Sequence, residues 1–144
     1  MLVREAMSRD VKTVTPGQPI QEAARIMLDT DIGALPVGEN DRLVGMITDR
    51  DIAVRGVAAG KSPSACVGDV MSREVRYCFD DEEAAHVARN MGEQQIRRLP
   101  VVDRDKRLVG ILALADLATS AKTGYATAAL SGISQAGGAH SQQS

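Results

Sequence analysis

The sequence predicts an α+β fold in which one βαββα unit occurs twice. The first observation behind this prediction is an internal repeat, because residues 32–37 recur as residues 96–101 at a spacing of 64, as Leu35 and Leu99 illustrate. The second observation is that each copy shows the same order of strand-type and helix-type patterns. Two copies are too few for a stacked array, so we expect them to pack face to face and to form a cleft.

The first copy opens with a short strand and a helix. Residues 11–15 are rich in β-branched side chains and end at Pro16-Gly17, which is typical of a strand followed by a turn. Pro19 suits the first turn of a helix, where its missing N–H has no partner to lose. The apolar residues that follow recur at helical spacing and predict one buried face, made of Ile20, Ala23, Ala24, Met27 and Leu28.

A hairpin and a second helix complete the copy. Residues 34–37 and 43–47 are short apolar runs separated by the turn-forming residues 38–41, which predicts two antiparallel strands. Thr48 then precedes a helix that we expect to end near Arg55. The second copy repeats this order, so each unit should hold a three-stranded mixed sheet and two helices.

The repeat also predicts the domain organisation. It places the first copy at residues 1–60 and the second at residues 61–120, with a linker rich in glycine and serine at residues 56–68. The tail at residues 121–144 is rich in Gly, Ala, Ser and Gln and has few large apolar side chains, so it cannot bury much surface. We assign this tail no function.

The composition narrows the classes of function. The 17 basic and 19 acidic residues leave a net charge of −2, which gives no field that would attract nucleic acid or an anionic membrane. No apolar stretch approaches the roughly 18 residues that cross a bilayer, and the first ten residues lack a signal-peptide pattern, so we expect a cytoplasmic protein. Cys66 and Cys78 are too few for a disulfide framework or a four-thiolate metal site, and we expect both to be free thiols.

Several linked motifs resemble one known family. Residues 33–37 read Gly-Ala-Leu-Pro-Val, and residues 43–51 read Leu-Val-Gly-Met-Ile-Thr-Asp-Arg-Asp. Residues 98–101 and 108–112 repeat the centre of both motifs in the second copy. Over about residues 1–120 the chain resembles the tandem cystathionine-β-synthase (CBS) domain pair, also called a Bateman module.

The resemblance implies both an architecture and a function. It implies two CBS units related by a pseudo-twofold axis, and a homodimer shaped like a flat disc. It also implies a non-enzymatic sensor that needs no cofactor and binds an adenosyl ligand in the clefts between the units. That ligand would be AMP, ADP or ATP, or alternatively NAD or S-adenosylmethionine, and a separate effector protein would respond to it.

Thr48 and Asp51 are the strongest candidates for binding residues. They stand at the end of a predicted strand and in the first turn of the next helix, where unpaired backbone N–H groups favour an anion. An ionised carboxylate only accepts hydrogen bonds, so Asp51 suits the two hydroxyls of a ribose. Thr48 can donate to a phosphate oxygen.

A structural role explains the same two residues. Thr-x-x-Asp at the start of a helix is also a capping box, worth roughly 0.5–2 kcal/mol, and this motif alone favours capping. In the second copy Ala113 replaces the threonine while Asp116 keeps the acid, which fits ribose binding better than capping. The helix dipole also accounts for Asp116, so both roles stay open.

The resemblance assigns further residues to two clefts. Tyr77 would either stack on adenine or fill space, and Arg98 would either hold a phosphate or be a solvated charge. The second cleft lacks a hydroxyl at Ala113, so it should hold phosphate less well, prefer a ligand that does not need this contact, or stay empty. The first set is Thr48, Asp49, Arg50, Asp51, Val75, Tyr77, Ile96 and Arg98; the second is Asp116, Val11, Thr13, Ile32 and Gly33.

No catalytic or metal-binding pattern is present in the sequence. The chain has no Gly-rich P-loop, no G-x-S-x-G and no H-E-x-x-H, so we expect no enzyme and no metal site. His86 stands on the polar side of a predicted helix and His140 in the tail, and none of the histidines and cysteines are at ligand spacing. The alternatives to a nucleotide sensor are a ligand-free structural or partner-binding homodimer and, third, a metal or redox sensor that uses these residues.

Overall fold

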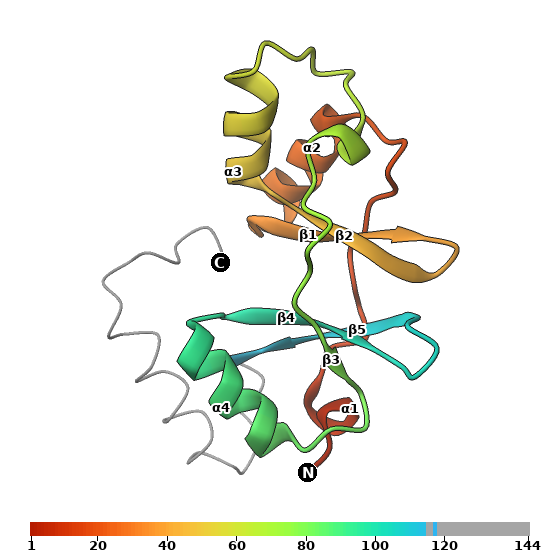
Figure 1. The fold of residues 1–144 in the computed structure, drawn as a ribbon, viewed down its shortest axis with the longest axis vertical. Coiled ribbons are helices and arrows are strands. Elements are labelled where there is room, and N and C mark those ends of the chain that lie inside the picture. Colours follow the sequence, from red (N-terminus) through yellow and green to blue (C-terminus); the bar gives the residue numbers. More distant parts are fainter. Residues whose placement is uncertain (115–116, 118–144) are drawn as a thin grey trace. The chain divides into compact units, whose positions relative to one another are not determined.

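The computed structural model describes residues 1–114 and Leu117, and the α+β prediction is confirmed in them (Figure 1). Asp116 and the tail at residues 121–144, for which predictions were made, lie outside the described residues. None of the helices in the described part is long and apolar enough to cross a membrane.

The chain forms two compact units that do not coincide with the two sequence repeats. The first unit consists of Lys12–Val75, and the second unit combines Met1–Val11 with the described residues from Arg76 onward. The predicted division near residue 60 follows the repeat in the sequence. In the structure, the residues before each repeat's first strand pack with the other repeat.

The first unit contains the predicted helix and hairpin. The helix α2 spans Ile20–Thr30, and the strands β1 (Ala34–Glu39) and β2 (Arg42–Thr48) pair antiparallel. The hairpin turns at Asn40 and Asp41, which both have positive φ, as a two-residue turn between twisted strands requires. The core of this unit consists of Val14, Ile20, Ala23, Met27, Leu35, Val37, Ile47, Val67, Val70 and Met71.

The predicted strand at residues 11–15 is reduced to a single parallel bridge. Val14 donates its N–H to the Pro36 carbonyl at 3.2 Å and accepts the Gly38 N–H at 2.9 Å. The next ladder bond would need an N–H on Pro36, which proline lacks. The first sheet therefore has two strands and one bridge where a third strand was expected.

The second unit contains the three-stranded mixed sheet. Strand β3 (Cys78–Phe79) pairs parallel with β4 (Arg98–Val102), which pairs antiparallel with β5 (Leu108–Ala113). The helix α4 spans Ala84–Gln94 and buries Val87 and Met91 against the core of this unit.

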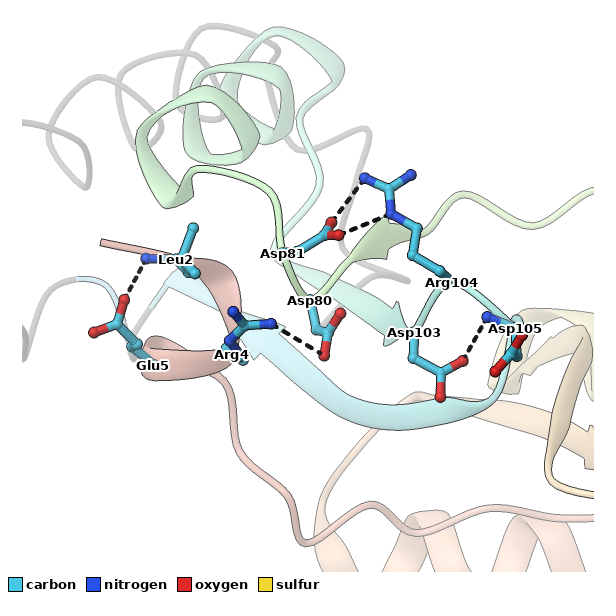
Figure 2. Close-up of polar contacts among 8 residues, drawn as sticks. All are labelled: Leu2, Arg4, Glu5, Asp80, Asp81, Asp103, Arg104 and Asp105. Carbon is cyan, nitrogen blue, oxygen red and sulfur yellow. Dashed lines mark hydrogen bonds and ion pairs between the residues drawn. The ribbon is translucent and has the colours of Figure 1, made fainter.

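Residues 1–8 pack with the second unit. The sequence did not predict this packing. A one-turn helix, α1 (Val3–Ala6), lies beside the loop before α4, where Arg4 donates its N–H to the Asp80 carbonyl at 3.0 Å. Figure 2 shows the Arg4 guanidinium directed at the Asp80 carboxylate, at 4.0 Å. The side chain of Glu5 accepts the Leu2 N–H at 2.7 Å and fixes the start of α1.

In both units a backbone segment pairs with the second strand of the hairpin through two hydrogen bonds. Ser72 exchanges two backbone hydrogen bonds with Met46 on β2, at 2.8 and 2.9 Å, and Ser8 does the same with Ile111 on β5. A glycine precedes the paired strand residue in each case. A methyl group at Gly45 would lie 2.8 Å from the Ser72 carbonyl oxygen, and one at Gly110 would lie 2.8 Å from that of Ser8.

Two predictions differ from the structure: the extent of the linker and the buried face of α2. Val67, near the end of the predicted linker, and Val70, just beyond it, are fully buried in the first unit, so the end of the linker is part of the core. Val67 begins a short 3-10 helix, η2 (Val67–Asp69), and Val70 follows its end. On α2, Ile20, Ala23 and Met27 are buried as predicted, whereas Ala24 and Leu28 are exposed.

We expect Gly45→Ala and Gly110→Ala each to destabilise the protein by about 1–3 kcal/mol, because the added methyl group displaces a backbone segment. The measurement is urea unfolding followed by circular dichroism. Gly17→Ala is the matched control, since a methyl group at Gly17 would have no atom within 4 Å, and it should change stability by less than about 1 kcal/mol. Equal stability of all three variants would contradict the close packing.

Both cysteines are free thiols, as predicted, but their environments differ. Cys66 is exposed, whereas Cys78 is buried on β3. Burial, with smaller contributions from the carboxylates of Glu82 and Asp80, raises the pKa of the Cys78 thiol to about 12. The Cys78 thiol is therefore neutral at physiological pH and a poor nucleophile.

A thiol reagent at neutral pH should therefore label Cys66 rapidly and Cys78 only after denaturation. The count of labelled thiols before and after addition of denaturant measures this difference. Cys66→Ser should remove the fast phase completely. A fast phase that persists in Cys66→Ser would show that Cys78 is accessible and reactive.

Candidate functional site

Thr48, at the end of β2, and Asp51 form the capping box that the sequence analysis gave as their structural role. Thr48 Oγ1 accepts the Asp51 N–H at 3.0 Å, and Asp51 Oδ2 accepts the Thr48 N–H at 3.0 Å. These bonds fix the start of the short helix α3 (Asp49–Asp51), which continues into the π-helix η1 (Ile52–Val57). The structural role of this pair is therefore present in the fold.

Capping does not use all the hydrogen-bonding capacity of these two side chains. Asp51 Oδ1 lies 3.9 Å from the Arg55 guanidinium, and the Asp51 side chain is 17% exposed. A carboxylate has about four lone-pair positions, so acceptor positions remain beyond the cap. Thr48 uses only its acceptor in the cap, which leaves its O–H as a donor.

Asp49 and Gly33 lie next to each other at this site. Asp49 donates its N–H to the Gly33 carbonyl at 2.9 Å, and its side chain accepts the Arg50 N–H at 2.8 Å. A methyl group at Gly33 would lie 3.0 Å from Asp49 Oδ2. Gly33, which the sequence assigned to the second cleft with Asp116, therefore lies beside Asp49, the residue after Thr48, in its own unit.

The hairpin explains this proximity. Ala34 and Thr48 are register partners across β1 and β2, so the residue before one strand meets the residue after the other. The second unit repeats the arrangement, because Leu114 donates its N–H to the Arg97 carbonyl at 3.1 Å. This proximity could have been predicted from the sequence, because antiparallel pairing in the predicted hairpin brings the start of its first strand next to the end of its second.

In the second unit, the position of Thr48 is occupied by a residue without a hydroxyl. Ala113 is the register partner of Arg98, so the Arg98 side chain stands at the same end of its hairpin. Ile96 is buried in the core of this unit. Asp116, the proposed acid of the second cleft, lies outside the described residues.

Tyr77 belongs to a cluster of aromatic and cationic side chains in the second unit. Its ring meets the Phe79 ring edge to face at 5.7 Å between centroids, and Lys106 Nζ lies 5.6 Å from the Tyr77 ring centroid. Arg104 lies 4.0 Å from the Phe79 ring centroid and makes two hydrogen bonds to Asp81, at 2.7 and 2.9 Å (Figure 2). The bonds from Arg104 hold the pKa of Asp81 below its usual range. Tyr77 remains 36% exposed despite these neighbours.

The predicted first-site residues fall in both units. Tyr77, Ile96 and Arg98 belong to the second unit, and each is described above in that unit alone. The first unit contains Thr48, Asp49, Arg50, Asp51 and Val75, together with Thr13, Ile32 and Gly33 from the predicted second site, whereas Val11 belongs to the second unit.

The described residues contain no cluster of three or more His, Cys, Asp or Glu side chains arranged to hold a metal ion. His86 is exposed on α4, where its Nε2 lies 3.3 Å from the Asn90 side-chain nitrogen.

Comparisons with known proteins assign the family. The model of the CBS domain matches the chain twice, at residues 3–56 and 67–122. The CBS domain-containing protein YhcV of Bacillus subtilis is 45% identical over 118 residues, which cover 82% of this chain and 84% of that protein.

Solved structures agree with this assignment. Hypoxic Response Protein I with two coordinated zinc ions is 39% identical with a TM-score of 0.71, and the match covers 82% of this chain and 97% of that one. The CBS domain pair of protein MJ0100, in complex with 5′-methylthioadenosine and S-adenosyl-L-methionine, is 34% identical with a TM-score of 0.67 and coverages of 82% and 93%. The structure of CBSX2 in complex with AMP is 27% identical with a TM-score of 0.69 and coverages of 81% and 92%. The chain therefore belongs to the CBS domain family and contains two CBS domains in tandem.

Proposed function

We propose that this protein is a non-enzymatic regulatory module that binds an adenosyl ligand through Thr48 and Asp51. The observation that carries the proposal is the spare hydrogen-bonding capacity of this pair after it has capped the helix. The chemistry of adenosine matches it, since a ribose presents two hydroxyl donors and Asp51 offers acceptors. The AMP and S-adenosylmethionine bound by two related structures share this adenosine group.

The role of Thr48 in this proposal is to bind the group attached to the 5′ carbon. Its O–H can donate to a phosphate oxygen, and a hydrogen bond to a charged acceptor contributes about 1.5–3 kcal/mol. An uncharged 5′ group would gain little from the same donor. Val75, Tyr77, Ile96 and Arg98 stay predictions as further binding residues, and so does the weaker site built on Asp116.

We also propose that the protein acts as a homodimer whose ligand-dependent state is recognised by a separate effector protein. A ligand changes such a state only if it binds one conformation more tightly than the other. A ligand-free homodimer that binds a partner is the alternative function. Zinc is tested beside the nucleotides because a related structure contains it.

Calorimetric titration tests the proposed site. We expect AMP, ATP, NAD or S-adenosylmethionine to bind, and Asp51→Ala to weaken binding at this site by at least tenfold because the ribose acceptor is lost. Glu5→Ala is the matched control, since Glu5 accepts the Leu2 N–H in the same three-residue geometry at a cap in the second unit. Thermal unfolding of both variants measures the cost of losing a cap, which should be about 0.5–2 kcal/mol in each.

Unchanged affinity in Asp51→Ala would show that the ribose is placed wrongly. The absence of heat and of thermal stabilisation with all four compounds would favour the ligand-free alternative. Stoichiometric zinc in the purified protein would favour the metal sensor.

A comparison of two ligands tests Thr48. In Thr48→Ala the affinity for AMP should fall about tenfold more than the affinity for 5′-methylthioadenosine, because only AMP has a phosphate to receive the Thr48 hydrogen bond. The loss of the cap affects both ligands equally and cancels in the comparison. Thr48→Ser should preserve both affinities, and an equal loss for the two ligands in Thr48→Ala would exclude phosphate binding by Thr48.

A further inference from the structure

Two methionines that correspond in the repeat lie where a backbone segment pairs with a hairpin. Met7 directly precedes Ser8, whose backbone pairs with β5 in the second unit. Met71 directly precedes Ser72, whose backbone pairs with β2 in the first unit. Each methionine is therefore placed to hold its segment against the strand.

The sulfur of each methionine lies against the glycine of the neighbouring strand. A methyl group at Gly110 would lie only 2.5 Å from Sδ of Met7. A methyl group at Gly45 would lie 2.8 Å from Sδ of Met71. At both places the space between the sulfur and the strand is too small for another heavy atom, and an unmodified thioether suits such an apolar contact.

The two methionines differ in their access to solvent. Met71 is 3% exposed and belongs to the core of the first unit. Met7 is partly exposed and packs at the margin of the core of the second unit. An oxidant in solution therefore reaches Met7, whereas the fold protects Met71 although its contact is of the same type.

Oxidation of Met7 is incompatible with this contact. Methionine sulfoxide is polar and carries an additional oxygen on the sulfur. If it stayed against the core it would bury a polar group, and if it left it would give up the packing on Gly110. In both cases the segment loses support where Ser8 and Ile111 exchange two backbone hydrogen bonds, at 2.8 and 2.9 Å.

We propose that Met7 is a site of reversible oxidation that controls the pairing of residues 1–8 with the second unit. The oxidant is a peroxide such as hydrogen peroxide. A sulfur lone pair attacks one peroxide oxygen and the O–O bond breaks. The proton of the transferred oxygen passes to the departing hydroxide, which leaves as water, so that sulfur is oxidised and peroxide is reduced. A methionine sulfoxide reductase reverses the step with a dithiol, which becomes a disulfide while the oxygen leaves as water.

The structural consequence is confined to one edge of the second sheet. Strand β5 ends the order β3-β4-β5, and the Ser8 segment pairs with its outer side at Ile111. Release of this segment exposes unpaired N–H and C=O groups on β5, which are a template for pairing with another chain. The first unit keeps its own pairing because Met71 is buried. This inference does not depend on the adenosyl ligand.

Hydrogen exchange of the full chain, followed by NMR, tests this proposal. Cys66→Ser is the starting protein, so that the exposed thiol takes no part in the reaction with hydrogen peroxide. After peroxide treatment we expect the amides of Ser8 and Ile111 to exchange at least about tenfold faster, because their pairing opens more often. The amide of Ser72 should keep its rate.

Mass spectrometry of peptides identifies the modified residue. It should find one added oxygen on Met7 and none on Met71. Methionine sulfoxide reductases of both epimer specificities, supplied with dithiothreitol, should remove the oxygen and restore slow exchange.

Three variants isolate the role of Met7. Met7→Leu keeps an apolar side chain of similar size, so exchange at Ser8 should no longer respond to peroxide. Met7→Gln has a polar, unbranched side chain and should show fast exchange at Ser8 without peroxide. Met46→Leu is the matched control, because Met46 is another partly exposed methionine, and it should respond to peroxide as the starting protein does.

Four results would each overturn the proposal. An unmodified Met7 beside an oxidised Met46 would show that the oxidant does not reach Met7. Unchanged exchange at Ser8 after Met7 is oxidised would show that the fold accommodates the sulfoxide. Equal acceleration at Ser8 and Ser72 would indicate a general loss of stability, and a response that persists in Met7→Leu would assign it to another residue.

Discussion

The close approach of a backbone segment to a glycine on each hairpin is the constraint on which both units depend. At Gly45 and Gly110 the absence of a side chain lets the Ser72 and Ser8 segments pair with the neighbouring strand residues. Val67, Val70 and Met71 precede the first of these segments, and they fill the core of the first unit. Each hairpin brings the start of its first strand next to the end of its second. In the first unit Thr48 stands at this end of the hairpin.

The sequence predicted the elements whose pattern is local. The hairpin consists of two short apolar runs joined by a turn, all within about fifteen positions, and the helix α2 follows a helical period, so short-range interactions determine both. The strand at residues 11–15 was wrong because its extent depends on a partner, and Pro36 on that partner cannot donate the next bond. The exposure of Leu28 was also hidden from the sequence, since periodicity shows the apolar residues of a helix but not what covers them.

At the candidate site, too, the sequence predicted the local motif. Thr48 and Asp51 were found from their spacing, and the structure shows that they cap a helix while retaining further hydrogen-bonding capacity. Gly33 was assigned to the second cleft by analogy and stays a prediction there; the register of β1 and β2 places it beside Asp49. This proximity follows from local pairing alone, because a hairpin brings the ends of its two strands together.

The second unit is built from two separate segments of the chain, and this affects the order of folding during synthesis. Residues 12–75 are contiguous and can pack as soon as they leave the ribosome. Residues 1–11 are made before residues 12–75, yet the residues that they pack against, from Arg76 onward, are made after both. This segment must stay unpaired while the first unit forms, and an N-terminal extension that restrains it would slow the completion of the second unit and leave the first unaffected.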